Sequence, residues 1–416
     1  MYSWESGSPA RSRSGWDSHW PAWPSPACEG FPRNSLLTAA FPLCYNVENL
    51  FRKRFSIPFS LFCLAFSLPV AKLVSLQNVA REAGVSLTTA SRVLNNSSHP
   101  VNQSTARRVL KAAERLGYSP NALARALVTQ RSGIIGVLVG DNADPYFAMI
   151  VHGIHAVVQS RGSMVIVCNT QRNPQTVLGY ISLLDSYDAD GILFVGGALT
   201  EPEYSEQIRL ACERYCRNGG HIVTLSEYPL SVPRVSIDNV KASYDMTRYL
   251  IGLGHEEIAY VRGPENLHTT DLREQGFRQA MVEAGLSIRA EFVVGGSFTF
   301  ESGQEAMQAL LDLPKRPTAV FAANDLMAIG CVFTALQRGL RIPQDLSVVG
   351  MDNIESTQYL TPQLTTMEVP MVEMGRQAAS CLFSMIEKEP FPAVTVLPHS
   401  LVIRGTAAPP NQPIKP

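Results

Sequence analysis

Cysteine is scarce in this 416-residue chain, and the cysteines present show no pairing pattern. Eight occur, three of them within the first 73 residues, which favours a reducing compartment over a disulfide framework. Cys212 and Cys216 are spaced i, i+4 on an expected helix, with His221 beyond, a spacing that could indicate a metal site. Filling of one helix face explains the spacing more simply, so we expect neither a metal nor a cofactor.

The motifs of common nucleotide-dependent and hydrolytic enzymes are also missing. The segment GVLVG after the first expected strand lacks the spacing of a GxGxxG loop, and there is no phosphate-binding P-loop. GHEEIA lacks the second histidine of an HExxH motif, and no set of serine, histidine and aspartate stands out. We therefore predict that the chain is not an enzyme. A sugar-modifying enzyme on a doubly wound fold remains the third possibility, without a visible catalytic set.

A convincing membrane-spanning run is lacking as well. In residues 52–71, three basic residues precede an apolar stretch that resembles a signal peptide or a membrane anchor. Two prolines and several serines make this a poor spanning helix, near the lower limit of the roughly 20 residues that a span needs. Because residues 1–34 are rich in Ser, Pro and Trp without periodicity, we expect 1–73 to be a disordered or wrongly assigned leader.

This leader suggests the hypothesis that translation begins near residue 73 or 74. No methionine lies between Met1 and Met149, so such a start would use a non-AUG codon. The intact mass of the native protein tests the hypothesis, because a polypeptide that begins at Met1 contradicts it. A membrane-tethered regulator is the rival. With the later start, we expect a cytoplasmic, nucleoid-associated protein without stable membrane association.

Acidic charge is nearly absent from one part of the chain. Residues 75–132 contain eight Lys or Arg and two Asp or Glu, whereas residues 133–416 contain twenty and thirty. The formal net charge of −1 therefore conceals a basic segment beside an acidic body. A compact basic segment binds a polyanion through phosphate contacts and counterion release. The basic segment is the expected nucleic-acid end.

Two short helices around one glycine follow the leader, in VSLQNVAREAGVSLTTASRVLNN, residues 74–96. The first has an apolar stripe at i, i+3, i+4 and i+7 and ends at Gly84, and the second, capped by Ser86, has Ala90, Val93 and Leu94 inward. The opposite face of the second helix carries Leu87, Thr88, Ser91, Arg92 and Asn95. This pattern is typical of a helix-turn-helix that enters a DNA major groove, although a helical hairpin in a protein core can share it.

A third helix is expected in STARRVLKAAERL, where Gly117 provides a C-terminal stop. Its inward face would hold Ala106, Val109, Leu110, Ala113 and Leu116. The following NALARAL provides one or two helical turns, too short to be stable alone, so a partner must order it.

Beyond residue 133, short apolar strands alternate with amphipathic helices. GIIGVLV, SMVIVC, GILFV and HIVTL form one cycle, and IAYV, TAVFAA and LSVVG form a second after residue 238. Alternation of this kind indicates βαβ units with parallel sheets covered on both faces. The number of strands favours two doubly wound subdomains, with a ligand cleft at the carboxyl ends of the strands, between the subdomains.

Eight motifs in a fixed order make the comparison with known proteins specific. They are VAREAGVSLTTASRVLN, RVLKAAERLGYSPNALARAL, DNADPYFAMIVHGI, VSIDN, LREQGF, FAANDLMAIG, IPQDLSVVGMDN and LTPQLTT. The region from residue 74 to about 407 resembles a transcriptional regulator of the lac repressor (LacI/GalR) family. The resemblance implies an all-α helix-turn-helix headpiece, a hinge helix, and an α/β core like a type I periplasmic binding protein that dimerises and senses a small molecule.

The expected domain boundaries follow from these motifs. We expect a leader at 1–73, a headpiece at 74–119, a hinge helix and linker at 120–132, a core at 133–407 and a proline-rich tail at 408–416. Within the core, one subdomain would comprise 133–236 and 366–390, and the other 237–365 and 391–407. The tail has no leucine heptad, so a homodimer on a pseudo-palindromic operator is expected rather than a tetramer.

For DNA binding, the resemblance implies that Leu87, Thr88 and Arg92 reach base edges, and Arg92 has the donors to read guanine. Leu127 would be the leucine that paired hinge helices wedge into the minor groove, with a plain core residue as the alternative. Contacts to the backbone or nearby bases would come from Ser75, Ser86, Thr89, Ser91, Asn95 and His99.

For the effector, the resemblance implies that Arg273 holds ligand oxygens. Asp238, Asn324 and Asp352 would supply the other polar groups, while Tyr146 and Phe147 would form the wall. An arginine fork with carboxylates and an amide suits the vicinal hydroxyls of a sugar. Asp238 and Asn324 could instead only cap the helices that follow them. Asp144-Pro145 and Asp352-Asn353 depart from the family's common pattern and leave the ligand open.

The function expected from the whole sequence is that of a DNA-binding transcriptional regulator, most often a repressor, controlled by a small effector that we expect to be a sugar or sugar derivative. The alternative is an exported or membrane-tethered solute-binding receptor with the same core. A receptor of that kind would have no use for the headpiece, which therefore distinguishes the two.

Overall fold

The computed structural model describes residues 74–94, 99–118 and 131–411. Four expectations lie outside the described residues: the leader 1–73 with its start hypothesis, Asn95, nearly all of the hinge 120–132 with Leu127, and the end of the tail. Within the described ranges, no helix is both long and apolar enough to cross a membrane.

Three helices form the headpiece: α3 (Leu76–Ala83), α4 (Leu87–Leu94) and α5 (Gln103–Leu116). The amide of Thr89 donates to Oγ of Ser86 at 3.1 Å, which caps α4 as its sequence predicts. Gly84 and Gly117 both have positive φ, the conformation that ends α3 and α5. The headpiece core consists of Val79, Ala80, Ala83, Ala90, Val109, Ala112 and Ala113.

One expectation for α5 is wrong. The helix period predicts Leu110 on the inward face, but 52% of this residue is exposed, and Ala112 is buried instead. Val109, Ala112 and Ala113 form the stripe that meets the other two helices, and Leu110 lies beyond its edge. The period alone does not distinguish these two settings of the stripe.

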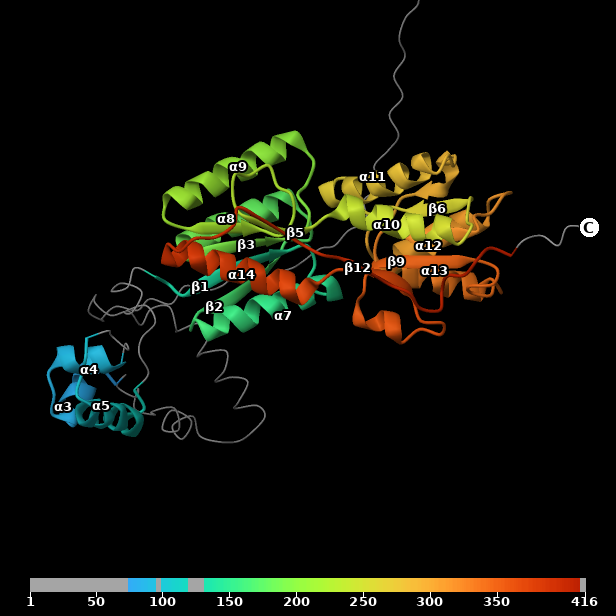
Figure 1. Cartoon of the computed structure of the whole chain (residues 1–416). Coiled ribbons are helices and arrows are strands. Elements are labelled where there is room, and N and C mark those ends of the chain that lie inside the picture. Colours follow the sequence, from blue (N-terminus) through green and yellow to red (C-terminus); the bar gives the residue numbers. More distant parts are fainter. Residues whose placement is uncertain (1–73, 95–98, 119–130, 412–416) are drawn as a thin grey trace, which may run out of the picture. The chain divides into compact units, whose positions relative to one another are not determined.

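The core contains two six-stranded sheets, each built from parallel strands with helices on both faces (Figure 1). The first sheet has the order β11-β5-β4-β3-β1-β2 and is parallel throughout. Its strands are β1 (Ile134–Val139), β2 (Met164–Asn169), β3 (Gly191–Val195), β4 (His221–Thr224), β5 (Arg234–Ile237) and β11 (Val394–Leu397). Its helices are α7 (Pro145–Ser160), α8 (Pro174–Ser186), α9 (Pro202–Arg217) and α14 (Met371–Glu387).

The second sheet has the order β12-β10-β9-β8-β6-β7, with only β12 antiparallel to its neighbour. Its strands are β6 (Ile258–Val261), β7 (Val293–Val294), β8 (Ala319–Ala322), β9 (Ser347–Asp352), β10 (Thr365–Glu368) and β12 (Ser400–Val402). Its helices are α10 (Asn239–Gly252), α11 (His268–Glu283), α12 (Phe300–Leu311), α13 (Asp325–Gln337) and the short 3₁₀ helices η1 (Ala290–Phe292) and η2 (Glu355–Gln358). Two doubly wound subdomains are therefore present, as the sequence predicts.

The boundaries between the subdomains differ from those expected. β10 pairs with β9, so the second subdomain continues through Glu368 and does not end at residue 365. β11 pairs with β5, so Val394–Leu397 belongs to the first subdomain and not to the second. Both strands are short and lie beside crossings, where strand propensity does not reveal which sheet a strand joins.

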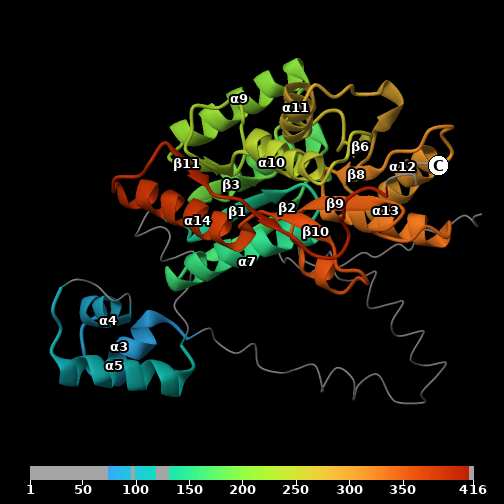
Figure 2. The same cartoon turned by 45° about the vertical axis from the view of Figure 1, so that its right-hand side comes forward.

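Alternation along the strands of the first sheet separates two packing faces. Val137 of β1 belongs to the cluster with Ile150 of α7 and Leu382 of α14, whereas Leu138 belongs to the cluster with Ile181 of α8. Figures 1 and 2 accordingly show α7 and α14 on one face and α8 and α9 on the other. The period of two explains why these strands are apolar throughout.

The helix pair α7 and α14 packs without room for side chains at its crossing. A Cβ on Gly153 would lie 2.1 Å from the carbonyl oxygen of Val372, and a Cβ on Gly375 would lie 2.1 Å from that of Ile150. Neither neighbour is the end of a flexible side chain. Glycine at both positions is therefore a condition of this contact.

We predict that Gly153→Ala lowers the free energy of unfolding by about 1–3 kcal/mol, because the added methyl group forces the two helix backbones apart. Urea denaturation of the full chain measures the effect. Gly179→Ala is the matched control, since Gly179 is exposed on α8 and a Cβ added there would meet nothing within 4 Å. The control should be neutral or gain about 0.5–1 kcal/mol, and an equal loss in both variants would contradict the packing argument.

Candidate functional site

The outward face of α4 is the candidate DNA surface. Leu87 is 46% exposed, and Thr88 and Arg92 are also exposed, as a recognition helix requires. Among the expected backbone contacts, Ser75, Ser86 and His99 are exposed, while Thr89 and Ser91 are half-buried. The Ser86 hydroxyl already caps α4, so any phosphate contact would have to share it.

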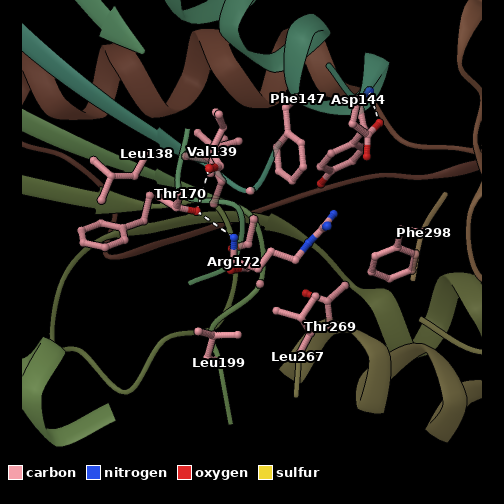
Figure 3. Close-up of a pocket in the computed structure, with 18 of the residues that line it drawn as sticks. Leu138, Val139, Asp144, Phe147, Thr170, Arg172, Leu199, Leu267, Thr269 and Phe298 are labelled. Atoms are coloured by element: carbon pink, nitrogen blue, oxygen red, sulfur yellow. Dashed lines mark hydrogen bonds between the residues drawn. The ribbon is translucent and has the colours of Figure 1, made fainter. Parts of the chain in front are cut away.

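The candidate effector site is a cleft between the two subdomains of the core (Figure 3). It encloses about 970 Å³ of empty space, including the part open to solvent. β1, β3, β8 and β9 all deliver residues to it from their carboxyl ends, the usual ligand position in parallel α/β sheets. Five of the six expected effector residues line the cleft: Tyr146, Phe147, Arg273, Asn324 and Asp352.

Arg273 is held by three bonds within the protein. Its Nε donates to Oδ1 of Asn239 at 3.0 Å, Nη2 donates to Oδ1 of Asp352 at 3.1 Å, and Nη1 donates to the carbonyl of Ala323. The side chain is only 5% exposed. A buried guanidinium needs such partners, and they fix its plane at the edge of the cleft.

Asp352 is constrained on both its side chain and its backbone. Its φ of 118° and the φ of 59° at Asn353 lie in the left-handed region, an arrangement that non-glycine residues keep only where the surroundings hold it. Asp325 provides that support, since its carboxylate accepts from the amide of Ile354 at 2.9 Å and from the hydroxyl of Thr366 at 2.6 Å. Burial raises the pKa of Asp352 to about 7, although Arg273 acts in the opposite direction.

Asp238 does not line the cleft. It is exposed, and its Oδ1 accepts from the amide of Lys241 at 2.8 Å as the N-cap of α10. The next residue, Asn239, faces the cleft instead and binds Arg273. Asn324 combines both roles, because it lines the cleft while its Oδ1 caps α13 and its Nδ2 donates to the carbonyl of Phe298 at 3.1 Å.

Several lining residues were not expected from the sequence. Asp144 caps α7 by accepting from the amide of Tyr146 at 2.9 Å, and burial raises its pKa. Arg172 enters from the loop after β2. A group of aromatic side chains completes the apolar part of the cleft: Phe194, Tyr204, Tyr228 and Phe298. Position after a strand is the available signal for Asp144 and Arg172, whereas the aromatic residues come from a strand (Phe194 on β3), a helix (Tyr204 on α9) and two loops (Tyr228 and Phe298).

A backbone bridge joins the two subdomains beside the cleft. Leu199 and Leu267 form an antiparallel bridge and both line the cleft. The amide of Thr200 donates to the carbonyl of Asn266 at 3.0 Å, and that of His268 donates to the carbonyl of Ala198 at 2.9 Å. These two bonds hold the subdomains together at this point without side chains.

A three-helix unit with an exposed polar recognition face, joined to two doubly wound subdomains around a polar cleft, defines a DNA-binding regulator with a ligand-sensing core. Residues 75–121 match the model of bacterial regulatory proteins of the lacI family, and residues 247–407 match the periplasmic binding protein-like domain. The HTH-type transcriptional repressor CytR of Escherichia coli (strain K12) is 36% identical over 336 residues, which cover 80% of this chain and 96% of that protein. The chain belongs to the lacI family.

Further relatives agree with this assignment. Catabolite control protein A of Priestia megaterium is 34% identical over 333 residues, covering 80% of this chain and 98% of that protein. The lac repressor dimer bound to operator and the anti-inducer ONPF has a TM-score of 0.73 at 26% identity, covering 81% of this chain and 100% of that one. A complex of the transcriptional regulator CelR with cellobiose has a TM-score of 0.59 at 30% identity, covering 80% and 100%.

Family membership confirms the main expectations from the sequence. The chain is a DNA-binding transcriptional regulator with a periplasmic-binding-protein-like effector domain, and its family consists of regulators rather than enzymes. The headpiece match removes the solute-binding receptor, because such a receptor would not carry this domain.

We predict that Asp352→Asn changes how stability depends on pH. In the wild type, the folded-state pKa of about 7 lies above the ordinary 3.8, so the folded state binds this proton more readily and the stability it confers falls as pH rises from about 4 to 7. Asp352→Asn has no ionisable carboxyl group at this position and therefore does not lose this stability as pH rises. Its free energy of unfolding relative to wild type should therefore increase between pH 5 and pH 8.

Urea denaturation at both pH values measures that change. The control is Asp345→Asn, because Arg341 holds the pKa of Asp345 at about 2, so this carboxyl is ionised in both states across the range. A relative stability of Asp352→Asn that stays constant from pH 5 to pH 8 would contradict the raised pKa.

Proposed function

We propose that this protein is a homodimeric, cytoplasmic repressor that releases or tightens its hold on a pseudo-palindromic operator when a sugar or sugar derivative occupies the core cleft. The observation that carries the proposal is the cleft itself, where the guanidinium of Arg273, the carboxylates of Asp144 and Asp352 and the amide of Asn324 face one cavity. Fixed donors and acceptors of this kind suit vicinal hydroxyl groups.

Two structural relatives support this ligand class. The CelR complex contains cellobiose, and a LacI family regulator from Enterococcus faecium has a TM-score of 0.59 to this chain with bound ribose. In this chain, Arg273 would donate to ligand oxygens with the N–H groups that its internal partners leave over, and Tyr146 and Phe147 would form the wall. Asp238 has no part in this proposal, because it caps α10 away from the cleft.

For DNA, we assign base contacts to Leu87, Thr88 and Arg92 of α4, whose exposed face supports the role. Backbone contacts would come from Ser75, Ser86, Thr89, Ser91 and His99, with Asn95 as a further contact. Leu127 would act as the minor-groove wedge of the hinge. A dimer of such headpieces reads inverted half-sites.

Coupling between cleft and operator requires that the ligand bind two states of the dimer unequally. Closure around the ligand changes the angle between the subdomains, and with it the packing of the first subdomains across the dimer. The hinge helices would then order or lose order. Whether a given compound acts as inducer or corepressor depends on which state it prefers.

Selection of bound sites from a randomised duplex pool, with the full chain at moderate salt, is expected to enrich an inverted repeat. Sequence-blind, salt-sensitive binding would contradict the assigned recognition role. Arg92→Ala should then lower discrimination at one base pair per half-site by about 1–3 kcal/mol. Arg107→Ala, which removes an exposed charge on α5, serves as the control and should weaken binding evenly across sequences.

Arg273→Ala should abolish the response to the effector while operator affinity remains, because the cleft loses its fixed donor group. Fluorescence anisotropy of a labelled operator, titrated with effector, measures both properties. Arg278→Ala is the control on the same helix, since that side chain is 48% exposed and pairs with Glu274 outside the cleft. A full response in the Arg273 variant would exclude this residue from effector binding.

A further inference from the structure

Arg172 differs from Arg273 in the partners of its side chain. Its guanidinium lines the cleft, yet within the described residues it makes no hydrogen bond and no ion pair. It contacts the ring of Phe298, whose centroid lies 5.8 Å from Cζ. Figure 3 shows the side chain extended through the cleft toward that ring. All five N–H donors of Arg172 are available, whereas Arg273 has committed each of its nitrogens to a bond inside the protein.

The backbone that positions Arg172 is strained. Gln171 and Arg172 have φ values of 51° and 53°, two consecutive non-glycine residues in the left-handed region. The turn is fixed by Thr170, whose hydroxyl donates to the carbonyl of Val139 at 2.8 Å and accepts from the amide of Arg172 at 3.3 Å. Strain of this kind persists where surrounding contacts enforce it, and it concentrates at functional sites.

Phe298 meets Arg172 from the other subdomain under a similar constraint. Its φ is 65°, and its carbonyl accepts from the side chain of Asn324 at 3.1 Å. The ring lies over Gly263, where a Cβ would approach Cζ of Phe298 to 2.2 Å. Strained loops on both sides of the cleft therefore bring the side chains of Arg172 and Phe298 into contact.

The neighbouring charges indicate what a ligand must offer. Asp144 lies close enough to Arg172 to influence its pKa, which burial lowers. One carboxylate oxygen of Asp144 accepts from an amide, and the other has no partner within the described part of the chain. Asp352 adds a second carboxyl group to the cleft, and its side chain is already bonded to Arg273. A hydroxyl group can both donate to the second oxygen of Asp144 and accept from Arg172, whereas a phosphate dianion has no proton to donate and places a second negative charge beside Asp144.

We propose that Arg172 is a specificity-determining residue of the effector cleft, which, together with Asp144, selects an uncharged ligand with vicinal hydroxyl groups over its phosphorylated form. This inference rests on the proposed effector function and narrows its ligand class. Arg172 is not among the effector residues that the resemblance to the family implies.

The test uses the full chain and matched probes: ribose, glucose and adenosine, each beside ribose 5-phosphate, glucose 6-phosphate or adenosine 5′-monophosphate. Isothermal titration and the shift in Tm measure binding. We expect at least one uncharged member to bind and its phosphorylated partner to bind at least tenfold more weakly. Preference for a phosphorylated member, or binding by no uncharged member, overturns the assignment.

Variants then test the residue. Arg172→Met should weaken binding of the uncharged probe about 10- to 150-fold, the loss of a charged hydrogen-bond pair. Tm of the unliganded protein should change little, because only the contact with the Phe298 ring is altered and no hydrogen bond or ion pair among the described residues is removed. Arg172→Lys should recover part of the affinity, since it keeps the charge but not the fork. Arg217→Met, an exposed arginine on α9, is the control and should bind normally.

Arg172→Gly separates a ligand role from a structural one. Glycine accepts the positive φ, so Tm of the unliganded protein should be equal to or higher than that of wild type, while probe affinity falls as in Arg172→Met. A lower Tm with unchanged affinity would assign Arg172 to structure alone. If Arg273→Ala loses the effector response and Arg172→Met keeps it, the proposed function stands and this inference fails. If both variants keep the full effector response, the proposed function and this inference both fail.

Discussion

The cleft depends on three short crossings of the chain between the two sheets. The chain leaves the first sheet after β5 and begins α10 at once, returns between β10 and α14, and crosses again between β11 and β12. In the third crossing, His399 contacts Asp245 of α10 at 3.0 Å between Nε2 and Oδ2. Connections this short permit bending about a hinge but not separation. The carboxyl ends of both sets of strands must therefore keep facing each other, and the site residues with them.

The polar groups of the cleft differ in how far hydrogen bonds within the protein compensate for their burial. Arg273 and Asp352 satisfy each other, and Asp325 supports the strained backbone beside them. Arg172 and Asp144 retain unused capacity on the opposite subdomain. In one half of the cleft the charged groups are paired with each other, and Arg273 keeps only the N–H groups beyond its three internal bonds. In the other half, the guanidinium of Arg172 and one oxygen of Asp144 have no hydrogen-bond partner among the described residues. A ligand that bridges the halves gains from the second without breaking the first.

Much of the fold could be predicted from the sequence, because apolar runs and helix periods are local signals. These signals predict the recognition helix and the two wound subdomains. The cleft residues are implied by the resemblance to the lac repressor family, and five of the six line the cleft. The resemblance points to Asp238, but one residue of register at a strand end decides which side chain caps the helix and which faces the cleft, and Asn239 takes the second position. The sheet membership of β10 and β11 was missed because pairing between distant strands leaves no local trace. For Arg172, position after a strand is a weak signal, because the role proposed for it rests on a guanidinium without hydrogen-bond partners among the described residues, which only three-dimensional contacts reveal.

The bridge between Leu199 and Leu267 has a consequence for how such a protein changes over evolutionary time. Its two hydrogen bonds join backbone atoms only, from Thr200 to Asn266 and from His268 to Ala198. Replacing a side chain inside the cleft leaves both bonds in place. The residues that line the cleft and the bridge between the subdomains can therefore change independently, because one depends on side chains and the other on backbone geometry. A gene duplicate could acquire a new ligand by a few substitutions in the cleft while keeping the backbone bridge that joins its two subdomains.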